Sequence, residues 1–93
     1  MAQKFELGQV VMTRGIANIL ESNARFQLEV NIAFAMYSNG DWGSISEGDA
    51  ELNEEALKIG DRLMACYPTC IGDIWIVTEW DRSVTTILLP EEY

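Results

Sequence analysis

The chain has 93 residues, of which 48% are hydrophobic, and fifteen acidic against six basic side chains leave a formal net charge of −9. This length accommodates one domain with a single modest core, and the hydrophobic content excludes wholesale disorder. The acidic balance argues against direct binding to nucleic-acid phosphates or to an anionic membrane, because both require clustered lysine and arginine.

The first forty residues predict a strand followed by helical structure. Residues 5–13 alternate loosely between apolar and polar side chains and predict a strand, with a bulge or bend at Gly8. Arg14-Gly15 breaks this pattern, and residues 16–20 predict a short helical turn. Residues 24–38 are ambiguous, because apolar side chains recur both with the period of a strand and at helical spacing. A strand of this length would be unusual, so we predict a helix, with a strand as the alternative.

A second helix is predicted in the middle of the chain. Residues 38–44 are rich in turn-forming side chains and predict a connector. Ser46 and the acids that follow it are typical of a helix start, and Gly60 is typical of a helix end. One face of this helix carries the apolar side chains Leu52, Ala56 and Ile59.

The last third of the chain predicts strands. Residues 62–67 have an extended pattern, and Pro68-Thr69 predicts the turn after them. Residues 74–79 and 83–89 are rich in β-branched side chains and predict a hairpin. The order β-α-α-β-β-β predicts an α+β fold in which a small antiparallel sheet of about four strands has two helices packed on one face. We expect a single domain spanning residues 1–93.

The residue types of the chain argue against catalysis. Histidine is absent, which removes the most common general base, the Ser-His-Asp triad and every histidine-containing metal motif. Glycine-rich loops for phosphates or dinucleotides are absent as well. Cys66 and Cys70 cannot complete a four-ligand zinc site alone, and we expect small buried thiols rather than a disulfide. The sequence therefore predicts a protein that is not an enzyme, without catalytic residues, cofactor or metal ion.

Acidic side chains are concentrated between residues 41 and 61. Seven acids lie there against one base, Lys58, which makes this segment net −6. Such a segment either forms a solvated face that keeps the protein in solution or meets a basic partner, for example a surface that holds DNA or RNA. The candidate partner-binding residues are Asp41, Glu47, Asp49, Glu51, Glu54, Glu55 and Asp61.

A second candidate contact surface lies in the turn of the predicted hairpin. Trp42 and Trp80 each adjoin acidic residues in predicted turns. Each ring either closes the edge of the core, with its N–H bonded to a backbone carbonyl, or anchors an interface, where tryptophan is common. The residues at the tip of the hairpin, also candidates for partner binding, are Glu79, Trp80, Asp81 and Arg82.

Four segments carry a resemblance to a protein family. Residues 5–11, Thr13-Arg14-Gly15-Ile16-Ala17, Asp41-Trp42-Gly43 and residues 74–93 resemble a family of small bacterial proteins carried on plasmids, prophages and conjugative elements. Members of that family are described as plasmid-related or as a restriction-enzyme subunit. The resemblance implies a fold and a mobile genetic element as the source, without an established activity.

Mobile elements often encode small acidic inhibitors of host defence, including anti-restriction and anti-CRISPR proteins. The resemblance therefore implies a non-enzymatic binding protein that inhibits a host defence complex through its acidic surface, with a protein partner and no direct contact to nucleic acid or membrane. The alternative is an accessory or structural protein of the element, which binds an element-encoded partner through Trp42, Trp80 and Tyr93. Because no signal-peptide pattern or long apolar run is present, the expected location is the cytoplasm of the bacterial host.

Overall fold

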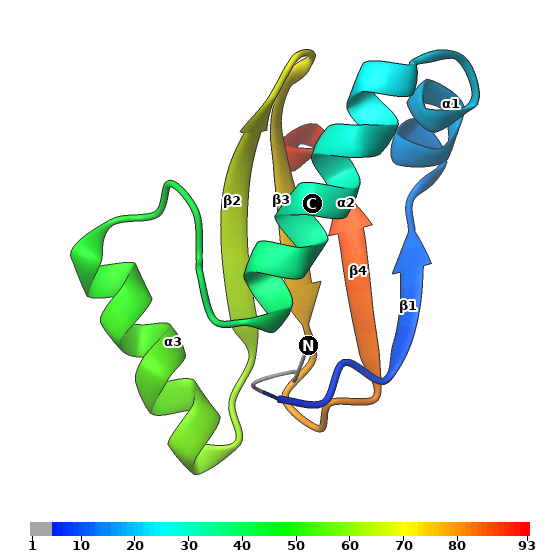
Figure 1. Cartoon of the computed structure of the whole chain (residues 1–93). Coiled ribbons are helices and arrows are strands. Elements are labelled where there is room, and N and C mark those ends of the chain that lie inside the picture. The colour runs from blue at the N-terminus through cyan, green and yellow to red at the C-terminus, as the bar shows by residue number, and fades with distance from the viewer. Residues whose placement is uncertain (1–4) are drawn as a thin grey trace.

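The computed structural model of the protein describes residues 5–93. The chain forms β1 (Gln9–Met12), α1 (Arg14–Ser22), α2 (Ala24–Ser38), α3 (Glu47–Ile59), β2 (Leu63–Thr69), β3 (Gly72–Thr78), β4 (Val84–Leu88) and a short 3₁₀ turn, η1 (Pro90–Glu92). The strands form one sheet in the order β1-β4-β3-β2 (Figure 1). The predicted α+β class is therefore confirmed.

One strand pair runs in a direction that the sequence did not predict. β3 pairs antiparallel with both β2 and β4, whereas β1 pairs with β4 in parallel. The prediction of an all-antiparallel sheet was therefore wrong for β1. A local apolar pattern predicts a strand but not its direction, which depends on the path of the chain through the helices and the hairpin between β1 and β4.

The predicted hairpin forms between β3 and β4, with Trp75 opposite Leu88. The turn before it is displaced, because Pro68 and Thr69 still belong to β2 and the chain turns after them. Pro68 is compatible with β2 because this is an edge strand, where a missing backbone N–H need not interrupt strand pairing.

The predicted strand over residues 5–13 is shortened by a bend at Gly8, the position at which the sequence predicted one. Gly8 has φ +63°, and a Cβ atom there would lie 2.3 Å from the carbonyl oxygen of Arg82, so a side chain does not fit. The residues before the bend belong to the core. Phe5 packs edge-on against Tyr37, with ring centroids 5.3 Å apart, and Leu7 is buried.

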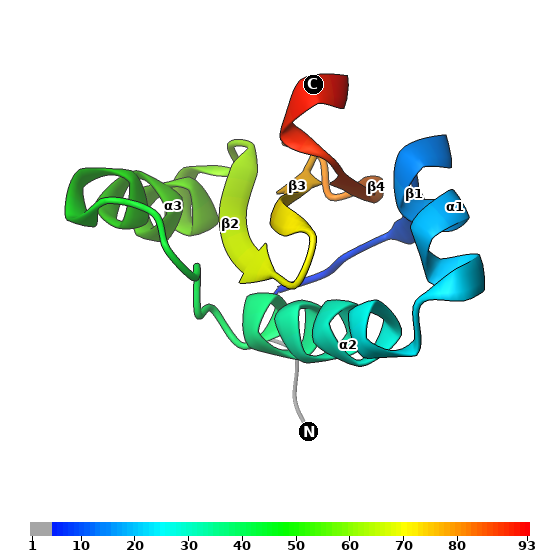
Figure 2. The ribbon, with the colours of Figure 1, turned by 90° about the horizontal axis from the view of Figure 1, so that it is seen from above.

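Residues 24–38 form the predicted helix, α2, which packs across one face of the sheet (Figure 2). Its buried side chains recur at helical spacing and belong to the same core as the sheet: Phe26, Val30, Ala33 and Tyr37. The competing strand-like pattern arises because Leu28 and Ile32, which are 61% and 50% exposed, lie on the solvent side. Apolar residues on the outside of α2 thus imitate a strand in the sequence.

Within residues 5–93, three α-helices form rather than two, and of these α2 covers a face of the sheet. Residues 16–20, predicted as a turn, belong to the nine-residue helix α1, whose Ile16 is fully buried. α1 lies beyond the C-terminal end of β1, while α3 lies beside β2 at the opposite edge of the sheet (Figures 1 and 2). The predicted packing of two helices on one face was wrong, because periodicity marks the apolar side of a helix and not the part of the sheet that it meets.

α3 forms as predicted, but only one residue of its predicted apolar face, Ala56, is buried. Leu52 and Ile59 are 66% and 67% exposed. The helix packs through Ala56 together with Asn53, and Leu57 is partly buried. Small or polar side chains suit this contact, because α3 approaches the backbone of an edge strand rather than the side chains of a sheet face.

Candidate functional site

α3 is fixed to the sheet at its start and at its centre. Ser46 caps the helix by accepting a hydrogen bond from a first-turn backbone N–H at 3.1 Å. Asn53 donates to the carbonyl oxygen of Met64 at 2.7 Å and accepts from the N–H of Met64 at 3.2 Å. Gly60 is the C-cap, as the sequence predicted. These contacts determine which side chains of α3 point away from the sheet.

The outward side of α3 carries four of the predicted acidic residues. Glu47, Glu51 and Glu54 are spaced by four and three residues, which places them on one side of the helix, and Glu55 lies next to them. All four side chains are exposed. We call this group, Glu47, Glu51, Glu54 and Glu55, the acidic face.

Trp42 is part of the core and not of the exposed surface. Its side chain is 6% exposed, and its ring lies against Phe5 and Tyr37. Its indole Nε1 donates to the Glu54 carboxylate at 3.0 Å, where the sequence predicted a backbone carbonyl. Trp42 therefore links the core to the acidic face but does not offer its ring to a partner.

The hairpin tip combines an exposed ring, Trp80, with a partly buried side chain, Arg82, that anchors the tip. Trp80 is 65% exposed, in agreement with a contact surface. Arg82, however, adopts a positive φ of 60° and directs its guanidinium to backbone carbonyls. Its Nη1 donates to the carbonyl oxygen of Asp61 at 2.5 Å, and its Nη2 donates to the carbonyl oxygen of Ala56 at 3.1 Å. Arg82 thus satisfies carbonyls at the C-terminal end of α3 and serves the fold.

The same contact makes the two predicted surfaces neighbours, because Arg82 joins the hairpin tip to the C-terminal end of α3. Asp81 remains exposed and accepts hydrogen bonds from the hydroxyl and the N–H of Ser83, which lower the pKa of its carboxyl. Glu79 lies at the start of this tip and is partly buried. The tip is therefore a charged extension of the α3 surface.

The three predicted aspartates outside the tip are placed separately. Asp49 lies in the first turn of α3, and Asp61 lies in the α3–β2 connection, where it accepts from the N–H of Arg62 at 2.7 Å. Asp41 lies on the connector, where its carboxylate accepts from the N–H of Gly43 at 3.2 Å. Asp41 therefore belongs to a turn and not to the acidic face.

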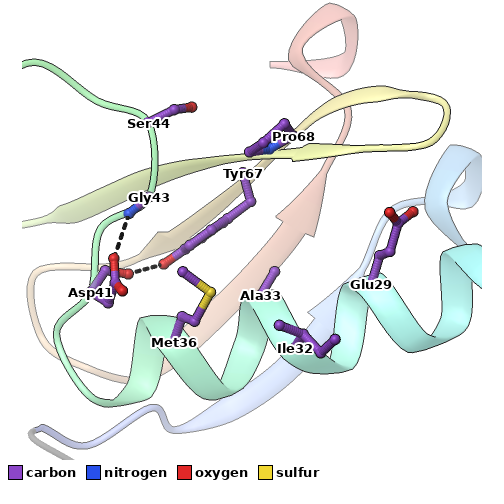
Figure 3. Close-up of a pocket in the computed structure, with 9 residues that line it drawn as sticks. All are labelled: Glu29, Ile32, Ala33, Met36, Asp41, Gly43, Ser44, Tyr67 and Pro68. Carbon is purple, nitrogen blue, oxygen red and sulfur yellow. Dashed lines mark hydrogen bonds between the residues drawn. The ribbon is translucent and has the colours of Figure 1, made fainter.

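Asp41 borders an open hollow of about 470 Å³ between α2, the connector and β2 (Figure 3). The polar groups around it are engaged with the protein itself. Tyr67 donates to the Asp41 carbonyl oxygen at 2.5 Å, and burial raises the pKa of its hydroxyl. Glu29 accepts from the N–H of Cys70 at 2.8 Å, which lowers the pKa of the Glu29 carboxyl. The remaining walls are mostly apolar, including Met36, and do not form a constellation of reactive groups.

Sequence reasoning missed an apolar stripe beside the acidic face. The exposed side chains of Leu52 and Ile59 lie on α3 next to Glu55, and together with Met64 they line a hollow of about 480 Å³. The sequence placed Leu52 and Ile59 on the packed side of the helix. Residues 50, 53 and 57 recur along α3 with the same helical spacing, which was the available signal that this side of the helix could be the packed one. Spacing alone, however, does not decide which of the two sides is buried.

The two cysteines are free thiols, as predicted, but they are not both buried. Cys66 is partly buried in β2, and Cys70 is exposed in the turn after it. A hydrogen bond with Glu29 raises the pKa of the Cys70 thiol. Within residues 5–93, no group of three or more cysteine, aspartate and glutamate side chains is placed to hold a metal ion.

No protein-family model, curated protein or solved structure matches the chain. The comparisons therefore leave the family resemblance as a prediction. In the part of the chain that the structure describes, no helix has the length and apolar character that crossing a bilayer requires.

Proposed function

We propose that the protein is a non-enzymatic binding module that uses the acidic face of α3 to occupy a basic surface on a protein partner. Following the family resemblance, this partner would be a nucleic-acid-binding complex of host defence, and occupying its basic surface would inhibit it. The observation that carries the proposal is the side-by-side arrangement of four exposed carboxylates and two exposed apolar side chains on one helix at the edge of the sheet.

The apolar stripe favours an interface over a merely solvated surface. A helix that only maintained solubility would gain nothing from Leu52 and Ile59, which remain largely in water. Protein interfaces, in contrast, combine apolar contacts with a charged surround. The carboxylates would accelerate encounter with a basic partner, and the two apolar side chains would slow dissociation.

The test compares two variants of equal net charge. Glu51→Lys with Glu55→Lys reverses the acidic face but leaves Glu54, which holds Trp42. The control, Glu21→Lys with Asp73→Lys, reverses two exposed carboxylates on α1 and β3. Each tagged protein is used to capture partners from a bacterial lysate that contains restriction and CRISPR complexes, with elution by increasing salt and identification by mass spectrometry.

We expect wild type and control to retain a nucleic-acid-binding complex that elutes at moderate salt, because exposed charges are screened over about 8 Å at physiological ionic strength. The α3 variant should bind the purified complex roughly tenfold more weakly or worse. In a fluorescence assay, the wild-type protein should also displace DNA or RNA from that complex. Equal capture by the α3 variant and the control would contradict the proposal.

A second candidate function is an accessory protein of the mobile element. The observation that favours it is the exposure of two aromatic residues, Trp80 at 65% and Tyr93 at 62%. Binding through these rings would be largely insensitive to salt and would be lost in Trp80→Ala but retained after reversal of the acidic face. The same capture experiment therefore separates the two functions.

A further inference from the structure

The two edge strands of the sheet, β2 and β1, differ in whether their outward backbone groups are paired. At the β2 edge, the outward backbone groups of Met64 are paired with the Asn53 side chain. The outward backbone groups of Cys66 are paired with the connector. The N–H of Cys66 donates to the carbonyl oxygen of Trp42 at 3.4 Å, and the carbonyl oxygen of Cys66 accepts from the N–H of Ser44 at 2.8 Å. The next outward residue, Pro68, has no N–H. This edge is therefore closed to a further strand.

Among residues 5–93, no further strand pairs with the outer edge of β1. The N–H of Gln9 donates to the carbonyl oxygen of Ser83, directly before β4, and the N–H of Thr13 donates to that of Ile87 in β4, at 3.0 Å in each case. The alternation of a strand therefore turns the N–H and carbonyl groups of Val10 and Met12 outward. Their side chains are 44% and 46% exposed. Residues 9–12 contain no charge and no proline, the devices that usually protect an edge strand. α1 lies beyond the end of β1 and leaves its length uncovered (Figure 1).

An apolar groove of about 470 Å³ accompanies this edge. Val10 and Met12 form its floor together with Ile87 of β4, and its walls include Leu20 of α1 and Phe34 of α2. An added strand would therefore find both unpaired backbone groups and an apolar surface for its side chains, which is the arrangement used in recognition by strand addition.

The geometry points to a second copy of the chain as the occupant, with the two β1 strands paired antiparallel. Val10 of one protomer would lie opposite the partner subunit's Met12, and these residues would exchange backbone hydrogen bonds across a two-fold axis perpendicular to the sheet. Both α2 helices would then lie on the same side, and the two grooves would merge around the paired Val10 and Met12 side chains.

Charge favours a second copy at this edge. Two protomers with a net charge of −9 repel each other, so they can associate closely only where acids are absent. Residues 7–13 carry no charge, and the acidic α3 lies at the other edge of the sheet, beside β2. Pairing through β1 thus keeps the two acidic faces far apart. The inference is independent of the proposed function, because the two surfaces lie at opposite edges.

The test is analytical ultracentrifugation of the full chain over a range of concentrations and salt. Val10→Pro removes an outward N–H without removing a bond to β4, and Met12→Lys places a charge beside the two-fold axis. Leu28→Lys is the matched control, since it changes an exposed apolar residue of α2 to lysine. Circular dichroism checks that each variant folds, and Met12→Lys decides the matter if Val10→Pro does not fold.

We expect wild type and Leu28→Lys to form dimers that tighten as salt increases, because salt screens the repulsion between acidic protomers. Val10→Pro and Met12→Lys should dissociate at least about tenfold more readily. This salt dependence is opposite to that expected for binding of a basic partner. A wild-type protein that is monomeric under all conditions would overturn the inference and leave the edge to an extended peptide of another protein. A dimer that both edge variants retain would overturn it as well.

Discussion

A line of buried hydrogen bonds crosses the core from α2 to the segment before β1. The hydroxyls of Tyr37 and Thr78 are 2.6 Å apart, those of Thr78 and Thr85 are 2.8 Å apart, and Thr85 lies 2.7 Å from the Leu7 carbonyl oxygen. Because that carbonyl can only accept, Thr85 donates to it, Thr78 donates to Thr85 and Tyr37 donates to Thr78. Burial raises the pKa of Tyr37 to about 12, so the line stays protonated at neutral pH.

The order of these donors predicts unequal effects of two substitutions. Thr85→Val leaves the Thr78 hydroxyl without an acceptor and removes the side-chain donor to the Leu7 carbonyl oxygen, and it should lower the free energy of unfolding by roughly 1–3 kcal/mol. Tyr37→Phe, at the start of the line, removes a donor but leaves every other donor with its acceptor. It should therefore lower the free energy of unfolding by only about 1 kcal/mol. Urea unfolding of both variants at neutral pH measures the difference. An equal cost, or a larger cost for Tyr37→Phe, would contradict the assigned direction.

The hydrogen bonds of the Glu92 carboxylate predict that the stability of the protein falls at acid pH. Its carboxylate accepts hydrogen bonds from the Thr13 hydroxyl, the N–H of Leu89 at 2.9 Å and the N–H of Gly15 at 3.1 Å, and it thereby caps the start of α1. The Thr13 bond is the main cause of a lowered pKa. The stabilisation should therefore be complete above the ordinary glutamate pKa, 4.5, and be lost as pH falls through the lowered value.

The measurement is the melting temperature of wild type and Glu92→Gln across this range. Wild type should melt higher near neutral pH, and the difference should shrink in acid, where its own carboxylate is protonated. Glu91→Gln, a neighbouring exposed position, serves as the control and should show a smaller effect. A difference that stays constant with pH would show that Glu92 acts through its shape and not its charge.

At the scale of the elements, Asn53 joins α3 to β2, because it bonds to both backbone groups of Met64. Asn53→Ala should lower the free energy of unfolding by about 1–3 kcal/mol, since it leaves two partly buried backbone groups of Met64 without these partners. Hydrogen exchange should accelerate at the Met64 amide and along α3, but not along α2. The control Asn18→Ala, at an exposed position of α1, should change neither. Unchanged exchange in α3 would mean that other contacts hold the helix.

For the whole molecule, the excess of negative charge predicts a gain in stability on charge reversal. Glu51→Lys with Glu55→Lys adds two charge units at each position, which takes the net charge from −9 to −5. Lower self-repulsion should raise the melting temperature in low salt, and the gain should vanish at about 1 M salt, where the screening length is about 3 Å. A lower melting temperature in low salt would instead assign these carboxylates to contacts that hold the fold.

Local patterns predicted much of the fold and part of the candidate site. The extents of α2 and α3, the bend at Gly8 and the β3–β4 hairpin depend on neighbours within a turn or two, so spacing and capping residues reveal them. The exposure of Glu51 and Glu55 follows in the same way from the concentration of acids on one helix.

The sequence left two alternatives open for Trp42, the core or an interface, and it did not predict the contacts of Arg82, because each role depends on a partner distant in the sequence. Trp42 is buried against Phe5 and Tyr37, and Arg82 caps a helix that ends more than twenty residues before it. A tryptophan or arginine beside acidic residues in a turn has the same local pattern whether it faces solvent or the core.

The α+β class, the acidic charge and its concentration in one helix follow from composition and from residues close together in the chain. Long-range packing, in contrast, sets the parallel pairing of β1 with β4, the outward position of Leu52 and Ile59 and, within residues 5–93, the difference between the closed β2 edge and the unpaired β1 edge. These features result from contacts between segments far apart in the sequence, such as that of Thr85 with Leu7, which are 78 residues apart. No local propensity encodes them, because only the joint packing of all elements selects which surfaces meet.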